Sequence, residues 1–175
     1  MNEIAKRFGQ VFWGLLLVIL DLTINRFDLL PDFIGYVLIA VGLGGITGLS
    51  TQFATARMCA WWLVSVAVVA LPPSRELGLF IGLIHLGLDC AMMWALLGGI
   101  MEYSTTRNRF DLAERASARR VAYVSMMCIV TILGFGARGM GPPAGVLAVI
   151  IVVCLLVLLV MILHLVHRVK TELAV

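Results

Sequence analysis

The sequence predicts an all-α integral membrane protein, a single polytopic domain of six transmembrane helices arranged as three hairpins. Its 175 residues are 62% hydrophobic and only 13% charged, with a mean hydropathy of +1.06. Soluble domains are about half apolar and about a quarter charged. The apolar residues also gather in runs close to the roughly 20 residues that a spanning helix needs. We therefore expect one transmembrane domain over residues 1–175, with no second folded domain.

Short polar turns separate the six apolar runs. The runs cover residues 8–24, 33–49, 56–71, 77–101, 121–137 and 144–165. The second, third and fifth are short for a span, so we expect their ends to extend by a few residues. All four cysteines lie inside these runs, which is typical of small packing residues and not of a disulfide framework or a zinc site.

The placement of Lys and Arg indicates the orientation. Three of the 13 basic residues, Arg26, Arg75 and Arg138, fall in the turns on one side of the predicted membrane, and the other ten fall on the opposite side. Cytoplasmic loops carry such an excess of basic residues. We therefore expect an even number of spans, with the N-terminus and the C-terminus both in the cytoplasm.

Residues 104–120, STTRNRFDLAERASARR, form the one long loop between the predicted helices. We expect it to be a basic cytoplasmic loop in which Asp111 and Arg115, four residues apart, pair on a helix surface. One interpretation is a solvated positive-inside loop. The other is a surface that docks on anionic lipid, at about 1 kcal/mol for each basic residue near the membrane.

Each predicted outer turn combines an Arg with at least one Pro near the start of an inward-running helix. Proline is favoured in the first turn of a helix. Arg26, Arg75 and Arg138 could therefore converge with three helix N-termini on an anion or a lipid head group. The alternative is that three short proline-containing turns arose independently.

Ionisable residues at membrane depth are costly and suggest function. Asp21 lies within the first predicted helix, and His85 and Asp89 lie one turn apart on one face of the fourth. Asn25 lies one turn beyond Asp21 on the same helix face. This cluster could handle protons or ions. The alternative is a polar clasp between the first and fourth helices. We predict no metal site, because three ligands on two helices match no recognisable spacing.

Two features of the second helix have structural explanations. Asp32 follows Pro31 and suits a helix cap, where a carboxylate is favoured by the helix dipole. A run of small residues follows, which would let another helix approach closely, either within the chain or in a homo-oligomer or other membrane partner. These residues are Gly42, Gly44, Gly45 and Gly48.

The stretch NRFDLLPDFIGYVLIAVGL, over residues 25–43, resembles a helical hairpin that recurs in small, uncharacterised bacterial multi-pass membrane proteins. The matching residues are Asn25, Phe27, Asp28, Leu30, Pro31, Asp32, Phe33, Ile34, Gly35 and Tyr36. The resemblance implies a bacterial inner-membrane protein and no defined activity.

Three classes of function remain open. The first is a small transporter or channel subunit that handles protons, ions or a small solute through Asp21, His85 and Asp89. The second is a non-catalytic scaffold or partner subunit of a larger complex. The third, a membrane-embedded lipid-modifying enzyme, has the least support, because no metalloprotease motif, nucleophile elbow or phosphate-cradling loop is present. We expect no cofactor and no nucleic-acid partner.

Overall fold

The structure is a computed structural model, and it describes residues 3–20, 23–24, 27–28, 32–70, 78–136 and 143–173. These residues form six α-helices, one 3-10 turn and a pair of two-residue strands. The helices are α1 (Glu3–Leu20), α2 (Asp32–Gly44), α3 (Thr51–Ala70), α4 (Gly78–Thr106), α5 (Phe110–Gly136) and α6 (Pro143–Glu172), with the 3-10 turn η1 at Thr47–Leu49. The predicted all-helical architecture with six helices is thus confirmed.

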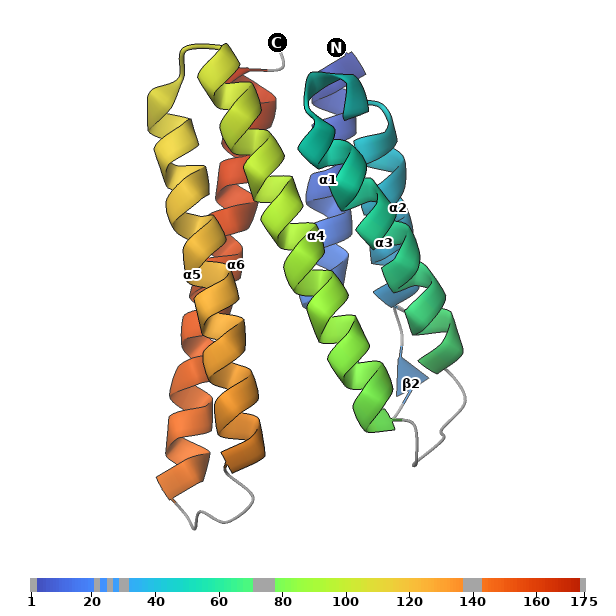
Figure 1. Cartoon of the computed structure of the whole chain (residues 1–175), viewed down its shortest axis with the longest axis vertical. Helices are drawn as coiled ribbons and strands as arrows, with labels where there is room; N and C mark the ends of the chain where they lie inside the picture. Colours follow the sequence, from blue (N-terminus) through green and yellow to red (C-terminus); the bar gives the residue numbers. More distant parts are fainter. Residues whose placement is uncertain are drawn as a thin grey trace.

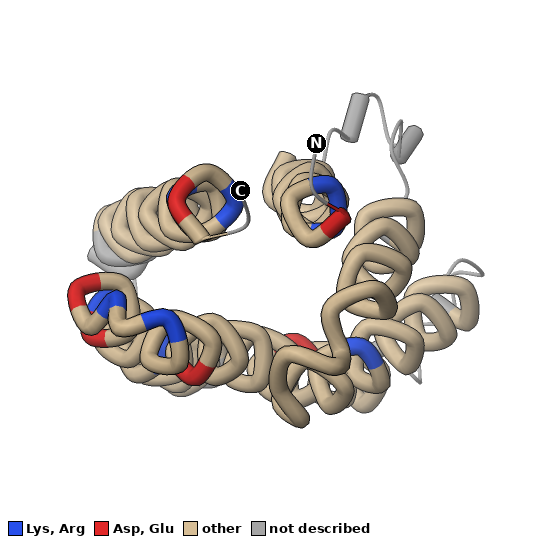
Figure 2. The backbone as a smooth tube through the Cα atoms, turned by 90° about the horizontal axis from the view of Figure 1, so that it is seen from above, with Lys and Arg blue, Asp and Glu red and all other residues tan. Residues whose placement is uncertain are grey.

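The helices run side by side as a bundle, with both chain termini at one end (Figure 1). Each helix packs against the next in the chain, and α1 also packs against α6. Viewed along the bundle, the backbone therefore traces an elongated ring of helices (Figure 2). This closure brings side chains of α1, α2, α4, α5 and α6 together in the middle of the molecule.

The first helix begins and ends earlier than predicted, over Glu3–Leu20 in place of residues 8–24. It ends at Leu20, and Thr23–Ile24 (β1) pairs antiparallel with Phe27–Asp28 (β2). The prediction of a helix to residue 24 was therefore wrong. Thr23 and Ile24 are β-branched residues, which suit an extended strand better than the end of a helix.

Glycines let α1 and α2 approach closely. A Cβ atom added to Gly14 would lie 2.7 Å from the carbonyl oxygen of Gly35, and one added to Gly35 would lie 2.9 Å from that of Gly14. Gly42 likewise faces the backbone of α1 at Arg7 and Val11. Contacts this short have no room for a side chain, so the two helices form a tight hairpin.

The other predicted small residues face different surroundings. Gly44 lies against the side chain of Arg57 and Gly45 against that of Arg7, whereas a Cβ on Gly48 would meet nothing within 4 Å. Three of the four glycines thus pack within the chain. A contact with a second copy or another protein stays a prediction.

The third helix begins at Thr51, a few residues before the apolar run at 56–71, in line with the expected extension of that short run. Ser50 precedes it, and its Oγ accepts a hydrogen bond from the backbone N–H of Gln52 at 3.1 Å. This is the bond that an N-cap serine forms with the first turn of a helix. The cap explains why the polar residues Thr51 and Gln52 belong to α3.

The predicted loop 104–120 is mostly helical, so that prediction was wrong. Helix α4 continues to Thr106 and α5 begins at Phe110. Between them, Asn108 has a φ of 58°, and the backbone N–H of Arg109 donates to Ser104 O at 2.9 Å. This is a Schellman-type helix ending, in which Asn tolerates the left-handed conformation.

The charged start of α5 is amphipathic. Its apolar residues Leu112, Ala113 and Ala116 are buried, while Glu114 and Arg115 are exposed. High charge suggested a loop, but charged residues on one helix face are compatible with burial of the other. The expected pair of Asp111 with Arg115 is replaced by ion pairs of Asp111 with Arg109 and Arg168.

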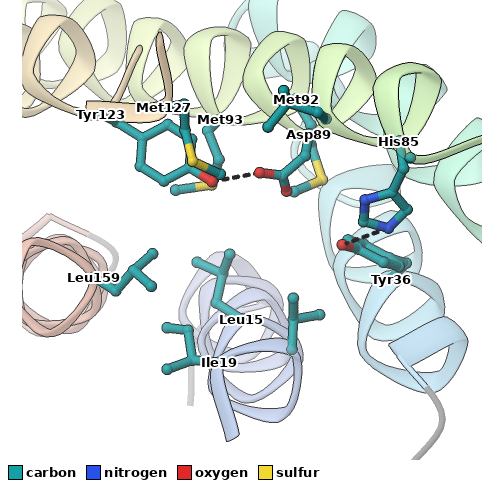
Figure 3. Close-up of a pocket in the computed structure, with 13 residues that line it drawn as sticks. Leu15, Ile19, Tyr36, His85, Asp89, Met92, Met93, Tyr123, Met127 and Leu159 are labelled. Atoms are coloured by element: carbon teal, nitrogen blue, oxygen red, sulfur yellow. Dashed lines mark hydrogen bonds between the residues drawn. The ribbon is translucent and has the colours of Figure 1, made fainter. Parts of the chain in front are cut away.

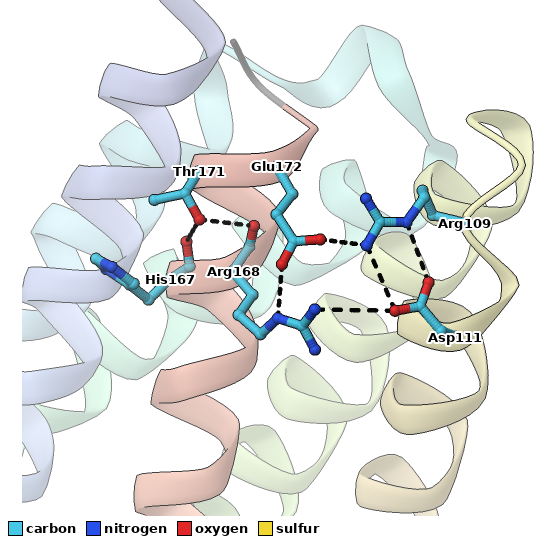
Figure 4. Close-up of polar contacts among 6 residues, drawn as sticks. All are labelled: Arg109, Asp111, His167, Arg168, Thr171 and Glu172. Carbon is cyan, nitrogen blue, oxygen red and sulfur yellow. Dashed lines mark hydrogen bonds and ion pairs between the residues drawn. The ribbon is translucent and has the colours of Figure 1, made fainter.

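A network of four charged residues joins the start of α5 to the end of α6 (Figure 4). Arg109 contacts Asp111 at 3.1 Å and also pairs with Glu172, while Arg168 contacts Glu172 at 2.6 Å and Asp111 at 3.9 Å. The hydrogen bonds to Asp111 and Glu172 raise the pKa of Arg109 above its ordinary value. Every charge in this network has a partner of opposite sign.

Aromatic side chains fill the core at the end of the bundle that holds the termini. Phe8 lies 6.0 Å from Phe53, edge to face, and 6.1 Å from Tyr103, stacked, between ring centroids. The hydroxyl of Tyr103 donates to the carbonyl of Leu173 at 3.0 Å. This aromatic cluster (Phe8, Phe53, Tyr103) connects α1, α3, α4 and the end of α6.

Four of the described helices are long and apolar enough to cross a membrane. These stretches are Thr51–Val69, Phe80–Thr106, Phe110–Gly134 and Val149–Glu172. Helix α2 is apolar but shorter, with 13 residues, or about 20 Å. Large apolar side chains are exposed along the outside of α6, including Val149, Ile150, Val153, Leu156, Val157 and Val160.

Candidate functional site

The middle of the bundle contains a cavity of about 330 Å³, which we call the central cavity. Residues of five helices line it: α1, α2, α4, α5 and α6 (Figure 3). Its lining includes Leu15, Tyr36, Gly82, His85, Asp89, Met92, Met93, Tyr123 and Met127. Its volume lies within the range of small-molecule sites, roughly 300–1,000 Å³.

Asp89 is the acidic residue of the central cavity. It lies in the middle of α4, is 9% exposed, and accepts a hydrogen bond from the hydroxyl of Tyr123 on α5. Within the described ranges no Lys, Arg or His forms an ion pair with it. A buried carboxylate costs free energy unless a cation, a proton or hydrogen bonds compensate it.

His85 lies one helical turn before Asp89, and the two side chains line the same cavity, as their i, i+4 spacing predicts. Its Nε2 lies 3.3 Å from the hydroxyl oxygen of Tyr36 on α2, and the tautomer of the imidazole decides which group donates. The two rings also meet edge to face, with centroids 5.7 Å apart. Tyr36 therefore contacts His85, and Tyr123 contacts Asp89, so each of these two polar side chains has a tyrosine partner.

Three methionines complete the wall around Asp89. Met92 and Met93 follow it on α4 and are 1% and 2% exposed, and Met127 lies one turn after Tyr123 on α5. Figure 3 shows these side chains gathered around the Asp89–Tyr123 hydrogen bond. Methionine is polarisable and flexible, so it can adapt to ligands of different shape. The wall thus combines one acid with soft apolar surface.

Several predicted site residues lie outside the described residues. These are Asp21, Asn25, Arg26, Arg75 and Arg138. The proposed cluster therefore reduces here to His85 and Asp89, and the convergence of the three outer Arg residues stays a prediction. Helix α2 starts at Asp32, at the position predicted for a capping carboxylate, but its side chain also lies outside the description.

Sequence reasoning missed Tyr36 and Tyr123. The chain has only three tyrosines, and all three are at most 4% exposed in the structure. A tyrosine within an apolar run needs a partner for its hydroxyl when buried. That rule could have marked both residues as parts of a polar site, although not which helices they contact.

The site offers oxygen, nitrogen and thioether groups, but few that ligate a hard metal ion. Among the residues that the structure describes, no three of His, Cys, Asp and Glu lie close enough together to hold a metal. The arrangement can instead exchange a proton at Asp89 and hold a positive charge beside it. The imidazole of His85 lies one turn away in the same cavity.

Comparison with models of protein families, with curated proteins and with solved structures finds no match for this chain.

Proposed function

We propose that the chain is a small membrane transporter whose central cavity binds an organic cation, with Asp89 as the counter-charge. The observation that carries the proposal is the burial of one acid in the wall of a ligand-sized cavity, with no ion pair to a basic residue among those that the structure describes. A clasp between helices needs no cavity. A site that must accept and release a charged solute needs both the cavity and an acid that is not permanently paired.

The lining fits a cation with apolar substituents better than a bare metal ion. The carboxylate of Asp89 supplies charge, and the rings of Tyr36 and Tyr123 supply aromatic faces that attract cations. The thioethers of Met92, Met93 and Met127 supply polarisable apolar contact. An inorganic ion such as Mg²⁺ would need several more oxygen ligands.

A proton competes with the cation for the same carboxylate. When Asp89 is protonated it has no charge to offer, and when it is ionised the cation replaces the proton. Competition of this kind couples release of a proton to uptake of a cation. His85 is placed to pass the proton along the cavity, because it lies one turn away on the same helix and bonds to Tyr36.

We also propose six spans with both termini in the cytoplasm of a bacterial cell, in the inner membrane. Support comes from the four long apolar helices, the asymmetric placement of Lys and Arg, and the resemblance of the hairpin at residues 25–43. Helices α1 and α2 are the short members, and their glycine contact makes them one unit. A reporter fused after Val175 should therefore be cytoplasmic, and an extracytoplasmic reporter would contradict this topology.

The test of function is calorimetric measurement of tetraethylammonium binding to the purified protein at several pH values. We expect wild type to bind more tightly as pH rises, because deprotonation of Asp89 creates the counter-charge. Asp89→Asn should weaken binding by about tenfold or more, since it removes a charge-assisted contact. Asp111→Asn, which removes an exposed acid outside the cavity, is the matched control and should bind like wild type.

Flux separates a transporter from a scaffold. In liposomes with an imposed pH gradient, wild type should accumulate the labelled cation and Asp89→Asn should not. Equal binding by wild type and Asp89→Asn would refute the cation site. Binding without flux would favour the non-catalytic scaffold or partner-subunit function.

A further inference from the structure

A second cavity lies near the end of the bundle that carries the termini, between α3, α4 and α5. It has a volume of about 370 Å³ and is separate from the central cavity in its lining residues. Its lining residues are Gln52, Gly98, Met101, Glu102, Thr105, Thr106 and Arg120. We call it the headgroup cavity.

Arg120 forms the basic wall of this cavity. Its guanidinium lies 3.7 Å from the ring centroid of Trp94, and a Cβ on Gly98 would lie 3.2 Å from its Cζ atom. The guanidinium therefore packs against α4 at Trp94 and Gly98. Its Nε is buried without a hydrogen-bond partner, and no acid in the described ranges forms an ion pair with it.

Glu102 forms the acidic wall. Its carboxylate accepts a hydrogen bond from Ser50, and it has no basic partner within the described part of the chain. The hydroxyls of Thr105 and Thr106 donate to the backbone carbonyls of Met101 and Glu102, which leaves their oxygens as acceptors. The cavity thus has a donor side at Arg120 and an acceptor side around Glu102, and the two charges are not paired with each other.

Both charges lie where their helices change from apolar to charged sequence. Between Asp89 and Glu102, α4 contains no charged residue, and α5 contains none after Arg120. Trp94 is 41% exposed next to the cavity. Tryptophan and arginine at such a boundary are typical of the membrane–water interface, where phospholipid headgroups lie.

We infer that the headgroup cavity binds a zwitterionic phospholipid whose headgroup carries a primary ammonium. Its phosphate would contact the Arg120 guanidinium, which matches phosphate geometry with two parallel donors. Its ammonium would donate to Glu102 and the threonine oxygens. A quaternary ammonium has no N–H to donate, so the site should select against choline headgroups. The inference rests on the proposed membrane location and not on cation binding.

The experiment is native mass spectrometry of the full chain released from nanodiscs of equal parts phosphatidylethanolamine and phosphatidylcholine. Wild type should retain phosphatidylethanolamine in preference by about tenfold, as expected for charge-assisted hydrogen bonds. Arg120→Gln should lose retention of both lipids. Glu102→Gln should retain phospholipid but lose the preference for ethanolamine. Arg115→Gln, which changes an exposed arginine of the same helix, is the matched control and should behave like wild type.

Arg120→Lys keeps the charge without the planar fork, and it replaces Arg120→Gln if that variant fails to fold. It should retain phosphatidylethanolamine about tenfold less well than wild type. Equal retention of phosphatidylethanolamine and phosphatidylcholine by wild type would overturn the inference. So would equal retention of lipid by wild type and the Arg120 variants. Displacement of the lipid by an equal concentration of free phosphoethanolamine would show a soluble phosphate ester as the ligand and would overturn the lipid assignment. Asp89→Asn should leave retention unchanged, so this result is independent of the central cavity.

Discussion

The terminal end and the middle of the bundle are packed differently. At the terminal end the aromatic cluster packs Phe8, Phe53 and Tyr103 together, all at most 3% exposed. In the middle, methionines and a buried acid surround a cavity of about 330 Å³. The aromatic cluster holds the helices together at the terminal end, beside the headgroup cavity, so the middle can hold the central cavity and a buried acid without loss of the fold.

The largest effect on stability should come from removing a ring of the aromatic cluster. Phe8→Ala removes a fully buried ring and should lower the free energy of unfolding by about 3–5 kcal/mol. Met127→Ala, which enlarges an existing cavity from a half-buried side chain, should cost about 1–2 kcal/mol. Reversible unfolding in mixed detergent–SDS micelles measures both. Equal losses would mean that the two regions are packed alike.

The same substitution should have opposite effects at the tight α1–α2 contact and in the central cavity. Gly14→Ala places a methyl group 2.7 Å from the backbone of α2 and should lower the free energy of unfolding by about 2–3 kcal/mol through overpacking. Gly82→Ala places it in the open central cavity and should raise this free energy by about 0.5–1 kcal/mol, because alanine favours helix over glycine. The same unfolding titration compares them. A loss at Gly82 would show that the central cavity is already filled.

Removing the tyrosine hydroxyl that bonds to Asp89 should affect stability, whereas removing the charge of Asp89 should affect function. Tyr123→Phe removes the hydroxyl that donates a hydrogen bond to Asp89, and it should lower the free energy of unfolding by about 1–1.5 kcal/mol. Asp89→Asn should be as stable as wild type or more so, because a buried acid retained for function tends to reduce stability. In the Asp89→Asn background, Tyr123→Phe should cost less than it does alone. Additive losses in this double-mutant cycle would show that the hydrogen bond carries no coupling.

The sequence predicted the features that depend on nearby residues and missed those that depend on packing. Hydropathy located the six helices, and the i, i+4 spacing placed His85 and Asp89 on one face. The assignment of residues 104–120 to a loop was wrong, because charged residues on one face of α5 are compatible with the buried Leu112, Ala113 and Ala116 on the other. The tyrosine partners could not be predicted, because Tyr123 is 34 residues from Asp89 and Tyr36 is 49 residues from His85. Only the closure of the bundle brings these residues together.

The smallest effect should come from the charged network at the α5–α6 end, where every charge is paired and exposed to solvent. Glu172→Gln removes one of the two acids that pair with both Arg109 and Arg168. Exposed ion pairs contribute little, and salt screens them, with a Debye length of about 3 Å at 1 M. We therefore expect a slight drop in the unfolding midpoint at low salt and none at high salt. A salt-independent loss as large as that of Phe8→Ala would show that this network, and not the aromatic cluster, holds the terminal end together.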